Sequence, residues 1–376
     1  MSATFTPEDH AYMAQALRLA ARGLNSVHPN PRVGCVIVRD GQIVGEGWHS
    51  IAGGPHAEVL ALKQAGDKAR DATAYVTLEP CCHHGKTGPC SDVLISAGIG
   101  RVVAAMPDPN PQVAGGGFTA LRNARIDVAF GLMAAEAAAL NPGFVKRMRT
   151  GRPYVRCKLA LTLDGKTAAA DGESQWLTGE AARADVQQWR IRSDAILTGI
   201  NTVIADDPAL TVREEQAGWS APTNVPWRQP RRVVLDSRLR FPPDARMLRL
   251  PGETWLVTLA NDAARLQLLA DGGAHVAQGT ADGERIALGD LVDWFGRQPV
   301  NEVWVEAGPT LSGALLEHGL VDEFIFYVAP QLLGGGRDAF FTQTMRQLSQ
   351  RVMLTIKDIR AVGADWRIIA VPKAAG

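Results

Sequence analysis

Two neighbouring stretches decide how the first part of this chain folds: GGPHAE at residues 53–58 and TLEPCCHHGKTGPC at residues 77–90. They supply one imidazole, from His56, and two thiols, from Cys81 and Cys90. Three such protein ligands leave a tetrahedral zinc ion one open position, which water can fill. Both cysteines precede expected helix starts, where the helix dipole favours a thiolate. We therefore predict an α/β domain that holds zinc through these three side chains.

Glu58 distinguishes a catalytic zinc site from a structural one. It lies two residues after His56, in the first turn of the same expected helix. Zinc lowers the pKa of a bound water to about 7, and a carboxylate at this position can carry a proton from that water to a departing nitrogen. H-x-E followed by P-C is the signature of zinc deaminases, in which the Glu is not a ligand. The pattern predicts hydrolytic deamination of a nucleobase-like heterocycle, with Glu58 as the acid/base.

The spacing of the two cysteines departs from the usual deaminase pair, which has two residues between its members. Eight residues separate Cys81 from Cys90 in this chain. The insert offers rival ligands, which are Cys82, His83 and His84. A structural zinc knuckle, or thiols that are merely buried, are therefore alternatives. A structural site is closed by four protein ligands and needs no acid/base beside it, so the combined motif favours the catalytic interpretation.

Length, charge and cysteine usage limit the remaining possibilities. The 376 residues exceed one ordinary core and indicate two domains. Lys+Arg and Asp+Glu are equal at 39 each, so we expect no nucleic-acid partner and no membrane partner. Three of the five cysteines lie within residues 81–90, which indicates a metal site in a reducing compartment. Without a signal-peptide pattern or an apolar run of spanning length, we expect a soluble, cytoplasmic protein.

The first part of the chain alternates helix and strand signals. Asp-Gly at residues 40–41 is a strong hairpin turn, and Pro55 favours a helix start. Asn-Pro-Gly at residues 141–143 is expected to end a helix, and residues 147–153 to form the linker to the second part. We predict helices over 11–22, 56–65, 91–97 and 131–140, and strands over 33–38, 43–48, 74–78 and 101–106.

The second part repeats the alternation and predicts an α/β domain with a mostly parallel sheet. The predicted helices cover 179–192 and 311–318. The predicted strands cover 154–160, 195–197, 232–235, 255–258, 303–305 and 324–328. A terminal hairpin is expected over 352–359 and 366–371, and a surface loop over 214–229.

No motif in the second part proves a cofactor on its own, because the chain has neither G-x-G-x-x-G after a strand nor a Walker A sequence. The best local signal runs from Val305 to Thr310, where a strand passes through a turn into a helix N-terminus. Backbone N–H groups at such a position can bind a pyrophosphate. The Gly-Pro pair in this stretch is equally compatible with a simple tight turn.

Long motifs in both parts resemble the bifunctional riboflavin-biosynthesis deaminase/reductase family. They are HPNPRVGCVIV, GWHSIAGGPHAE, TLEPCCHHGKTGPC and MPDPNP, followed by KLALTLDGKTAAADGESQWLTG, LTGINTVIADDPALTVR and WVEAGPTLSGALL. The resemblance covers nearly the whole chain, and in that family an insert of this kind splits the cysteine pair. It implies an α/β protein with an N-terminal cytidine-deaminase-like three-layer domain over residues 1–149. A C-terminal dihydrofolate-reductase-like domain would follow over residues 150–376.

The family also implies the two reactions and their cofactors. Its first domain uses zinc to hydrolyse the 2-amino group of 2,5-diamino-6-ribosylamino-4(3H)-pyrimidinone 5′-phosphate. Its second domain uses NADPH to reduce the ribosyl group of the deaminated product to ribityl. The small-molecule partner would thus be a phosphorylated pyrimidine, and we further expect a homo-oligomer.

The resemblance assigns residues to each ligand. The pyrimidine phosphate would contact Asn30, His49, His83, Lys86, Asp108 and Asn110. NADPH would contact Ala160, Trp176, Thr202, Asp206, Ser237, Gly308, Pro309, Thr310, Leu311, Ser312, Gly313 and Ala314. The ribosyl substrate would face Ser174, Arg190, Leu210, Arg213 and Glu306, and Lys158 is a candidate to position the sugar in the reductase reaction.

Several of these residues also have ordinary structural explanations. Asn30 and Asn110 precede prolines in turns, where Asn is common for local reasons. Lys86 could be a solvated loop charge, although a cation near zinc would suit a phosphate. Arg190 could lie on the solvated face of its helix, although guanidinium groups bind phosphate bidentately, as Arg213 could also do.

Two other functions remain as alternatives. The chain could deaminate tRNA or a free nucleoside and use its second domain for binding, but the neutral charge speaks against tRNA. It could also be a non-enzymatic scaffold stabilised by zinc, in which case metal removal would unfold the first domain.

Overall fold

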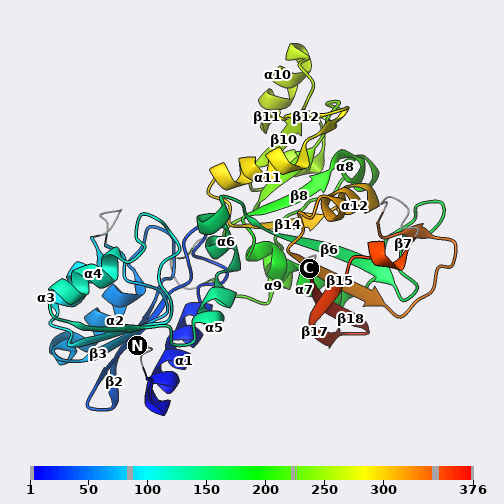
Figure 1. Cartoon of the computed structure of the whole chain (residues 1–376). Helices are drawn as coiled ribbons and strands as arrows, with labels where there is room; N and C mark the ends of the chain where they lie inside the picture. The colour runs from blue at the N-terminus through cyan, green and yellow to red at the C-terminus, as the bar shows by residue number, and fades with distance from the viewer. Residues whose placement is uncertain (1–3, 83–87, 222–224, 226, 341–346, 374–376) are drawn as a thin grey trace. The chain divides into compact units, whose positions relative to one another are not determined.

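The computed structural model describes residues 4–82, 88–221, 225, 227–340 and 347–373 of the chain (Figure 1). The chain divides into two compact units, one built from residues 1–151 and 221–227 and the other from residues 152–220 and 228–376. Both units are α/β, as the alternation in the sequence predicts. Each helix among the described residues is too short or too polar to cross a lipid bilayer.

A five-stranded sheet forms the middle of the first unit, in the order β2-β1-β3-β4-β5. Its strands are β1 (Gly34–Arg39), β2 (Gln42–Trp48), β3 (Thr73–Val76), β4 (Arg101–Ala104) and β5 (Asp127–Phe130). β1 is antiparallel to β2 and β3, whereas β3, β4 and β5 are parallel. The predicted turn joins β1 to β2, with φ of 53° at Asp40 and 75° at Gly41, as tight hairpin turns require.

Helices cover both faces of this sheet, because alternate residues of a strand point to opposite sides. They are α1 (Pro7–Ala21), α2 (Ala57–Ala65), α3 (Cys90–Ser96), α4 (Gly116–Asn123), α5 (Ala134–Leu140) and α6 (Pro142–Thr150), with a 3₁₀ turn over Gly66–Ala69. Cys35 and Ile37 of β1 belong to a core cluster with α2, α3 and α4. Val36 and Val38 belong to a separate cluster with α1, α5 and α6. The three-layer prediction is confirmed.

The end of the first unit differs from the prediction. Helix α6 extends through Thr150 and β6 begins at Tyr154, so only residues 151–153 of the expected linker are irregular. Helix α5 ends at Leu140, as predicted, but Pro142 then begins α6, a helix that the prediction lacks. Proline fits the first position of a helix because the N–H group that it lacks would have no partner there.

A nine-stranded sheet forms the middle of the second unit, in the order β11-β10-β9-β8-β14-β6-β15-β18-β17. Each neighbouring pair from β11 to β15 in this order is parallel. β18 is antiparallel to both of its neighbours, β15 and β17. The prediction of a mostly parallel sheet is confirmed. In chain order they are β6 (Tyr154–Thr162), β8 (Ala195–Gly199), β9 (Arg231–Leu235), β10 (Thr254–Thr258), β11 (Ala274–Gln278), β14 (Glu302–Glu306), β15 (Glu323–Ala329), β17 (Leu354–Val362) and β18 (Asp365–Pro372).

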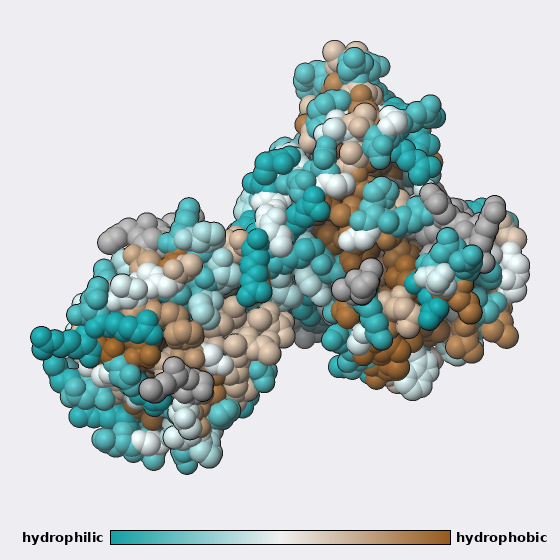
Figure 2. All heavy atoms as spheres, in the orientation of Figure 1, coloured by the Kyte–Doolittle hydropathy of each residue, from teal (hydrophilic) through white to brown (hydrophobic). Residues whose placement is uncertain are grey.

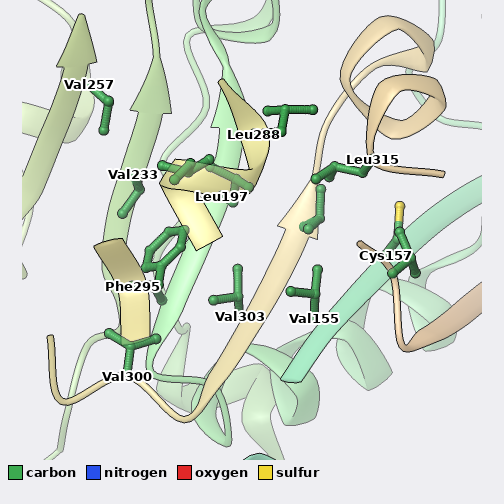
Figure 3. Packing of buried hydrophobic residues seen from close by; sticks show 14 of the residues in the cluster. Val155, Cys157, Leu197, Val233, Val257, Leu288, Phe295, Val300, Val303 and Leu315 are labelled. Atoms are coloured by element: carbon green, nitrogen blue, oxygen red, sulfur yellow. The ribbon is translucent and has the colours of Figure 1, made fainter. Parts of the chain in front are cut away.

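Helices also cover both faces of the second sheet. They are α7 (Glu180–Ile191), α8 (Ile200–Asp206), α9 (Glu214–Ala217), α10 (Ala263–Asp271), α11 (Leu288–Arg297) and α12 (Pro309–Glu317). On one face, Val155, Leu197 and Val303 pack with Phe295 of α11 and Leu315 of α12 (Figure 3). The opposite face packs against α7, α8 and α10. The remaining elements are short: β7 (Lys166–Ala168) pairs with β16 (Arg337–Asp338), β12 (Ala281–Asp282) pairs with β13 (Arg285–Ile286), and 3₁₀ turns cover Arg246–Arg249 and Leu348–Gln350.

The surface of each unit mixes hydrophilic and hydrophobic residues on the face shown in Figure 2. Several large hydrophobic side chains of the terminal hairpin are exposed. Ile356 and Ile359 of β17 are 55% and 52% exposed, and Trp366 of β18 is 49% exposed. β17 is also the last strand of its sheet among the described residues.

Candidate functional site

The N-terminus of α2 carries the first part of the predicted zinc site. His56 is the N-cap of this helix, with φ −73° and ψ 163°, and Glu58 lies in its first turn. A glycine of β2 lets the helix approach the sheet closely, because a Cβ atom on Gly47 would lie only 2.2 Å from the carbonyl oxygen of Ala57. The hairpin strand therefore fixes the position of the helix end that presents both side chains.

The two predicted thiol ligands come from the chain after β3. Cys81 follows this strand by a few residues, and Cys90 is the first residue of α3. His56 Nδ1 lies 3.1 Å from Cys90 Sγ and 3.6 Å from Cys81 Sγ, and the three ligand atoms all lie within 4.8 Å of one another. Tetrahedral zinc, with N and S ligands at their usual bond lengths, separates such an N from an S by about 3.5 Å. The donor set therefore fits a zinc ion.

Hydrogen bonds inside the cluster prepare a thiolate. The backbone N–H of Cys90 donates to Cys81 Sγ at 3.3 Å. Hydrogen bonds from the Cys90 thiol and then from His56 lower the pKa of Cys81 to about 4, while the same pairing raises the pKa of Cys90. Cys81 is thus ionised at neutral pH, which is the form of cysteine that binds zinc.

Glu58 lies buried beside the ligands without being one of them. Its side chain is 3% exposed, and burial raises the pKa of its carboxyl group against the opposing effect of His56. The neighbouring Cys90 thiol also acts to lower this pKa. Among the described residues, the cluster that could hold a metal consists of His56, Cys81 and Cys90. Glu58 is therefore placed to exchange protons next to the metal.

Cys82, the first residue of the insert, is not part of that cluster in the described chain. Its Sγ lies 3.9 Å from the carbonyl oxygen of Val113, and a Cβ atom on Gly116 would lie 2.6 Å from it. The thiol thus packs against the chain from Val113 to the first residue of α4. His83, His84 and Lys86 lie outside the described residues, so their roles stay predictions.

Asn30 and His49 meet next to the zinc ligands. Asn30 Nδ2 lies 3.1 Å from His49 Nε2, and His49 Nδ1 lies 3.0 Å from the carbonyl oxygen of Pro55. Because a carbonyl only accepts, Nδ1 carries the proton and Nε2 accepts from the Asn30 amide. Burial lowers the pKa of His49, whose ring centroid lies 5.2 Å from that of His56. Two predicted substrate residues and a metal ligand therefore come together, with His49 neutral.

Asp108 and Asn110 lie on the loop after β4. Asp108 Oδ1 accepts from the N–H of Asn110 at 2.8 Å, and Asn110 Oδ1 accepts from the N–H of Gln112 at 3.1 Å. Both side chains thus make the local turn contacts that Asx residues often make. The loop is also held by Glu79, whose buried carboxylate accepts the N–H of Asp108 at 3.1 Å. The sequence prediction did not include Glu79. An acid between an apolar strand and the Pro-Cys pair is the signal that could have revealed it.

A second group of charged side chains lies on neighbouring strands of the second unit. Glu306 ends β14, and its register partner on β6 is Lys158. Arg190 of α7 donates to both oxygens of Glu306, at 2.6 and 2.9 Å, and to the carbonyl oxygen of Thr211 at 2.7 Å. Burial opposes ionisation of Glu306, but the charge and hydrogen bonds of Arg190 lower its pKa to about 2. Arg190 is therefore paired with a carboxylate, and its helix face is not solvated.

Lys158 faces a less polar environment than an ordinary lysine. Burial lowers the pKa of its ammonium group, and Glu306 acts in the opposite direction. A lysine of this kind is suited to donating a hydrogen bond to a substrate oxygen.

Most residues predicted to contact NADPH lie where parallel strands end. Ala160 lies near the end of β6, Thr202 follows β8, Ser237 follows β9, and the segment from Gly308 to Ala314 leaves β14 and begins α12. Ligands of open α/β sheets bind outside the carboxyl ends of the strands. Among the described residues, no atom lies within 4 Å of a Cβ built on Gly308. This turn thus has room for a ligand to approach its backbone N–H groups, which fits a dinucleotide.

Asp206 connects the end of α8 to another predicted segment. Burial raises the pKa of its carboxyl group, and the nearby side chain of Gln175, which lies between Ser174 and Trp176, acts in the opposite direction. The indole of Trp176 is 66% exposed, and the guanidinium of Arg183 lies 4.8 Å from its ring centroid. An aromatic ring this exposed is free to stack on a ligand.

Leu210 and Arg213 lie on the segment between α8 and α9. Leu210 is buried and has φ of 46°, a conformation that non-glycine residues rarely adopt. The N–H of Arg213 donates to Gln187 of α7 at 2.9 Å, and Arg190 holds the carbonyl oxygen of Thr211. Helix α7 thus fixes this segment, while the Arg213 side chain stays exposed.

The donor set, the buried acid and the two sheets define a zinc-dependent deaminase fused to a second α/β catalytic domain. Residues 6–106 match the cytidine and deoxycytidylate deaminase zinc-binding region, and residues 153–368 match the RibD C-terminal domain. The chain belongs to the RibD family of riboflavin biosynthesis proteins. It is a bifunctional deaminase and reductase, and His56, Cys81 and Cys90 form its zinc-binding site.

Relatives of nearly equal length support this assignment. The RibD protein of Escherichia coli K12 is 52% identical over 368 residues, which cover 95% of this chain and 98% of that protein. The structure of Acinetobacter baumannii RibD has a TM-score of 0.88 at 46% identity, covering 97% of this chain and 99% of that one. A Thermotoga maritima structure has a TM-score of 0.83 at 31% identity, with the same coverage.

Proposed function

We propose that residues 1–149 hydrolyse the 2-amino group of 2,5-diamino-6-ribosylamino-4(3H)-pyrimidinone 5′-phosphate, and that residues 150–376 then reduce the ribosyl group to ribityl with NADPH. The observation that carries the first step is the cluster of His56, Cys81 and Cys90 beside the buried Glu58. Similarity to the Thermotoga maritima protein supports the substrate. That protein is described as a diaminohydroxyphosphoribosylaminopyrimidine deaminase and 5-amino-6-(5-phosphoribosylamino)uracil reductase.

In the deamination, Cys81, Cys90 and His56 would hold zinc through two thiolates and one imidazole, and the bound metal would supply the Lewis acidity that activates a water molecule. Glu58 takes a proton from the attacking water on a carboxylate oxygen and gives it to the departing 2-amino nitrogen, which leaves as ammonia. Because Glu58 is buried, bulk water does not compete for this proton. His49 orients the amide of Asn30, whose Oδ1 then accepts a hydrogen bond from the pyrimidine.

In the reduction, NADPH supplies the hydride when it is bound. The backbone N–H groups at the start of α12 bind its pyrophosphate, because the space around the N-cap residue Gly308 is open to a ligand. Lys158 donates to an oxygen of the opened ribosyl group, and the charge of Glu306, its register partner, opposes the lowering of its pKa by burial. The rest of the cofactor contacts Ala160, Trp176, Thr202, Asp206 and Ser237.

The phosphorylated substrates require cations and polar side chains at both sites. In the deaminase these are Asn30, His49, His83, Lys86, Asp108 and Asn110. In the reductase, Ser174, Arg190, Leu210, Arg213 and Glu306 face the ribosyl phosphate. Of this group, the exposed Arg213 is best suited to the phosphate, because its guanidinium faces solvent while that of Arg190 is paired with Glu306.

We also propose that the chain forms a homo-oligomer in the cytoplasm. A sheet edge with unpaired backbone groups and exposed apolar side chains favours association, and β17 combines such an edge with Ile356 and Ile359. Mass measurement in solution tests this, and a monomer at all concentrations would contradict it. Five free cysteines suit a reducing compartment.

A coupled assay with the full-length protein tests the two reactions together. We expect NADPH to be oxidised only in the presence of the ribotide, with the absorbance change of deamination coming first. Glu58→Gln and Lys158→Met proteins should each fail alone and restore conversion when mixed, because the deaminated intermediate can diffuse between them. Oxidation of NADPH with the ribotide by the Glu58→Gln protein alone would contradict the proposed order, and an inactive wild type would contradict the substrate.

A further inference from the structure

The buried carboxylate of Glu79 collects four backbone donors from two other segments of the first unit. Glu79 is 2% exposed. Its Oε1 accepts the N–H groups of Gly117 at 3.0 Å and Phe118 at 3.2 Å. Its Oε2 accepts the N–H groups of Asp108 at 3.1 Å and Gly115 at 3.0 Å. Each carboxylate oxygen therefore accepts two hydrogen bonds, and both oxygens are needed to bind all four N–H groups.

Three of these donors belong to the start of α4. Gly115 is the N-cap of this helix, and no side chain at that position caps it. The first N–H groups of a helix have no partner inside it. A carboxylate at this end gains charge-assisted hydrogen bonds and a favourable helix dipole. Glu79, far away in the sequence, thus caps α4 from the neighbouring segment.

The fourth donor connects this cap to the loop predicted to bind the substrate. The N–H of Asp108 reaches Glu79, and the Asp108 and Asn110 side chains then fix the turns that follow it. The loop continues to Val113, whose carbonyl oxygen lies 3.9 Å from the thiol of Cys82. The substrate loop is therefore held by Glu79 at Asp108, and at Val113 it contacts Cys82, the residue next to the zinc ligand Cys81.

The packing leaves little room for these segments to slide. A Cβ atom on Gly117 would lie 1.9 Å from the carbonyl oxygen of Pro80. The backbone N–H of Glu79 also donates to the carbonyl oxygen of Met106 at 3.0 Å. Helix α4 and the chain from Glu79 to Cys81 are thus in direct backbone contact.

We propose that Glu79 is a positioning residue of the deaminase, which holds the substrate loop in place relative to the zinc ligand Cys81. This proposal rests on the proposed deaminase function and on the assignment of Asp108 and Asn110 to the substrate. Zinc does not depend on Glu79 in this scheme, because none of the three ligand side chains bonds to it. Loss of Glu79 should therefore weaken substrate binding more than metal binding.

Glu79→Gln in the full-length protein tests the proposal, because an amide nitrogen cannot accept the two N–H groups that one oxygen accepts. We expect kcat/KM for the ribotide to fall about ten- to a hundredfold, mainly through a higher KM. Zinc should stay at one ion per chain. The amides of Asp108, Gly115 and Gly117 should exchange hydrogen faster than in the wild type. Glu136→Gln, which changes an exposed acid of the same unit, is the matched control and should behave as wild type.

Three outcomes would overturn the role of Glu79: a KM within about twofold of the wild type, loss of zinc, or a fall in kcat alone. If the Glu79→Gln protein does not fold, Glu79→Asp gives the same test, because it keeps the charge but cannot reach all four donors. The reductase reaction on supplied intermediate is an internal check and should stay unchanged. A wild type that does not deaminate the ribotide contradicts the proposed function, whereas an active wild type with an unaffected variant contradicts only the role of Glu79.

Discussion

Replacing Glu58 by glutamine should abolish deamination while the zinc site stays intact. The amide has nearly the same shape as the carboxylate, so the buried position next to Cys90 can hold it. It cannot take a proton from water and return it to the leaving amino group. The variant thus removes one chemical function from the site and leaves the packing nearly unchanged.

The magnitude follows from the place of Glu58 in the structure. A positioned acid/base contributes about 10²- to 10⁴-fold to a rate, which is about 3–5 kcal/mol of transition-state stabilisation. Glu58 is 3% exposed, so solvent water cannot take its place. The loss in kcat should therefore lie toward the upper end of that range. Zinc binding should not change, because the ligand cluster comprises His56, Cys81 and Cys90.

The assay combines metal analysis with two rates. Zinc per chain, kcat for deamination of the ribotide, and NADPH consumption on supplied intermediate are measured for the wild type and for Glu58→Gln. We expect one zinc, almost no deamination and a normal reductase rate. Loss of zinc would refute the reasoning, because Glu58 would then be a ligand, and so would a kcat within about threefold of the wild type.

Three further tests, on the cysteines, on Arg190 and on Glu306, are equally direct. Cys81→Ser and Cys90→Ser should each lose zinc, because a thiolate is a better zinc ligand than a hydroxyl group. Cys82→Ser should keep both zinc and activity. Metal analysis of the three proteins tests this, and loss of zinc from Cys82→Ser would overturn the ligand set. Arg190→Met should lower the free energy of unfolding by up to about 3–5 kcal/mol, because the buried Glu306 loses its bidentate cation and keeps the indole N–H of Trp304 and the charge of Lys158. Denaturant titration measures this, and an unchanged midpoint would show that the pair stabilises nothing. The pKa of Glu306 is depressed from 4.5 to about 2, so its carboxylate stabilises the folded state above about pH 4.5, and this contribution is lost as the pH falls toward about 2. The unfolding free energy of Glu306→Gln should therefore depend less on pH in this interval, and equal slopes for both proteins would contradict the assignment.

The zinc ligands could be predicted from the sequence because their chemistry depends on residue type and short spacing. His56 and Glu58 lie on one turn of a helix, and the Pro-Cys pair marks the end of a strand. The hairpin of β1 and β2 could also be predicted from the sequence, because an Asp-Gly pair between two strands strongly favours a tight hairpin turn. The amphipathic helix α11 is missing from the prediction even though Leu291 and Phe295 lie at helical spacing, so the local signal was available there.

Other features depend on contacts that sequence spacing does not reveal. Helix α4 begins with Gly116 and Gly117, which disfavour a helix, and the carboxylate of Glu79 supplies the missing cap from a distant segment. Arg190 and Glu306 were each assigned to the substrate, and their pairing could not be foreseen because 116 positions separate them. Such contacts arise from tertiary structure, which overrides local propensity.

The position of β14 in the second sheet has a consequence for the order in which the protein folds. β6 lies between β14 and β15, so Val155 pairs with Val303 and Cys157 pairs with Phe324. During synthesis, β6 emerges long before either neighbour, and pairing over such a separation is slow. The strands of the first unit all lie within residues 34–130 and can pair much earlier. A nascent chain that stops before β14 also lacks β15, β17 and β18. One edge of β8 and both edges of β6 are therefore unpaired and open to aggregation.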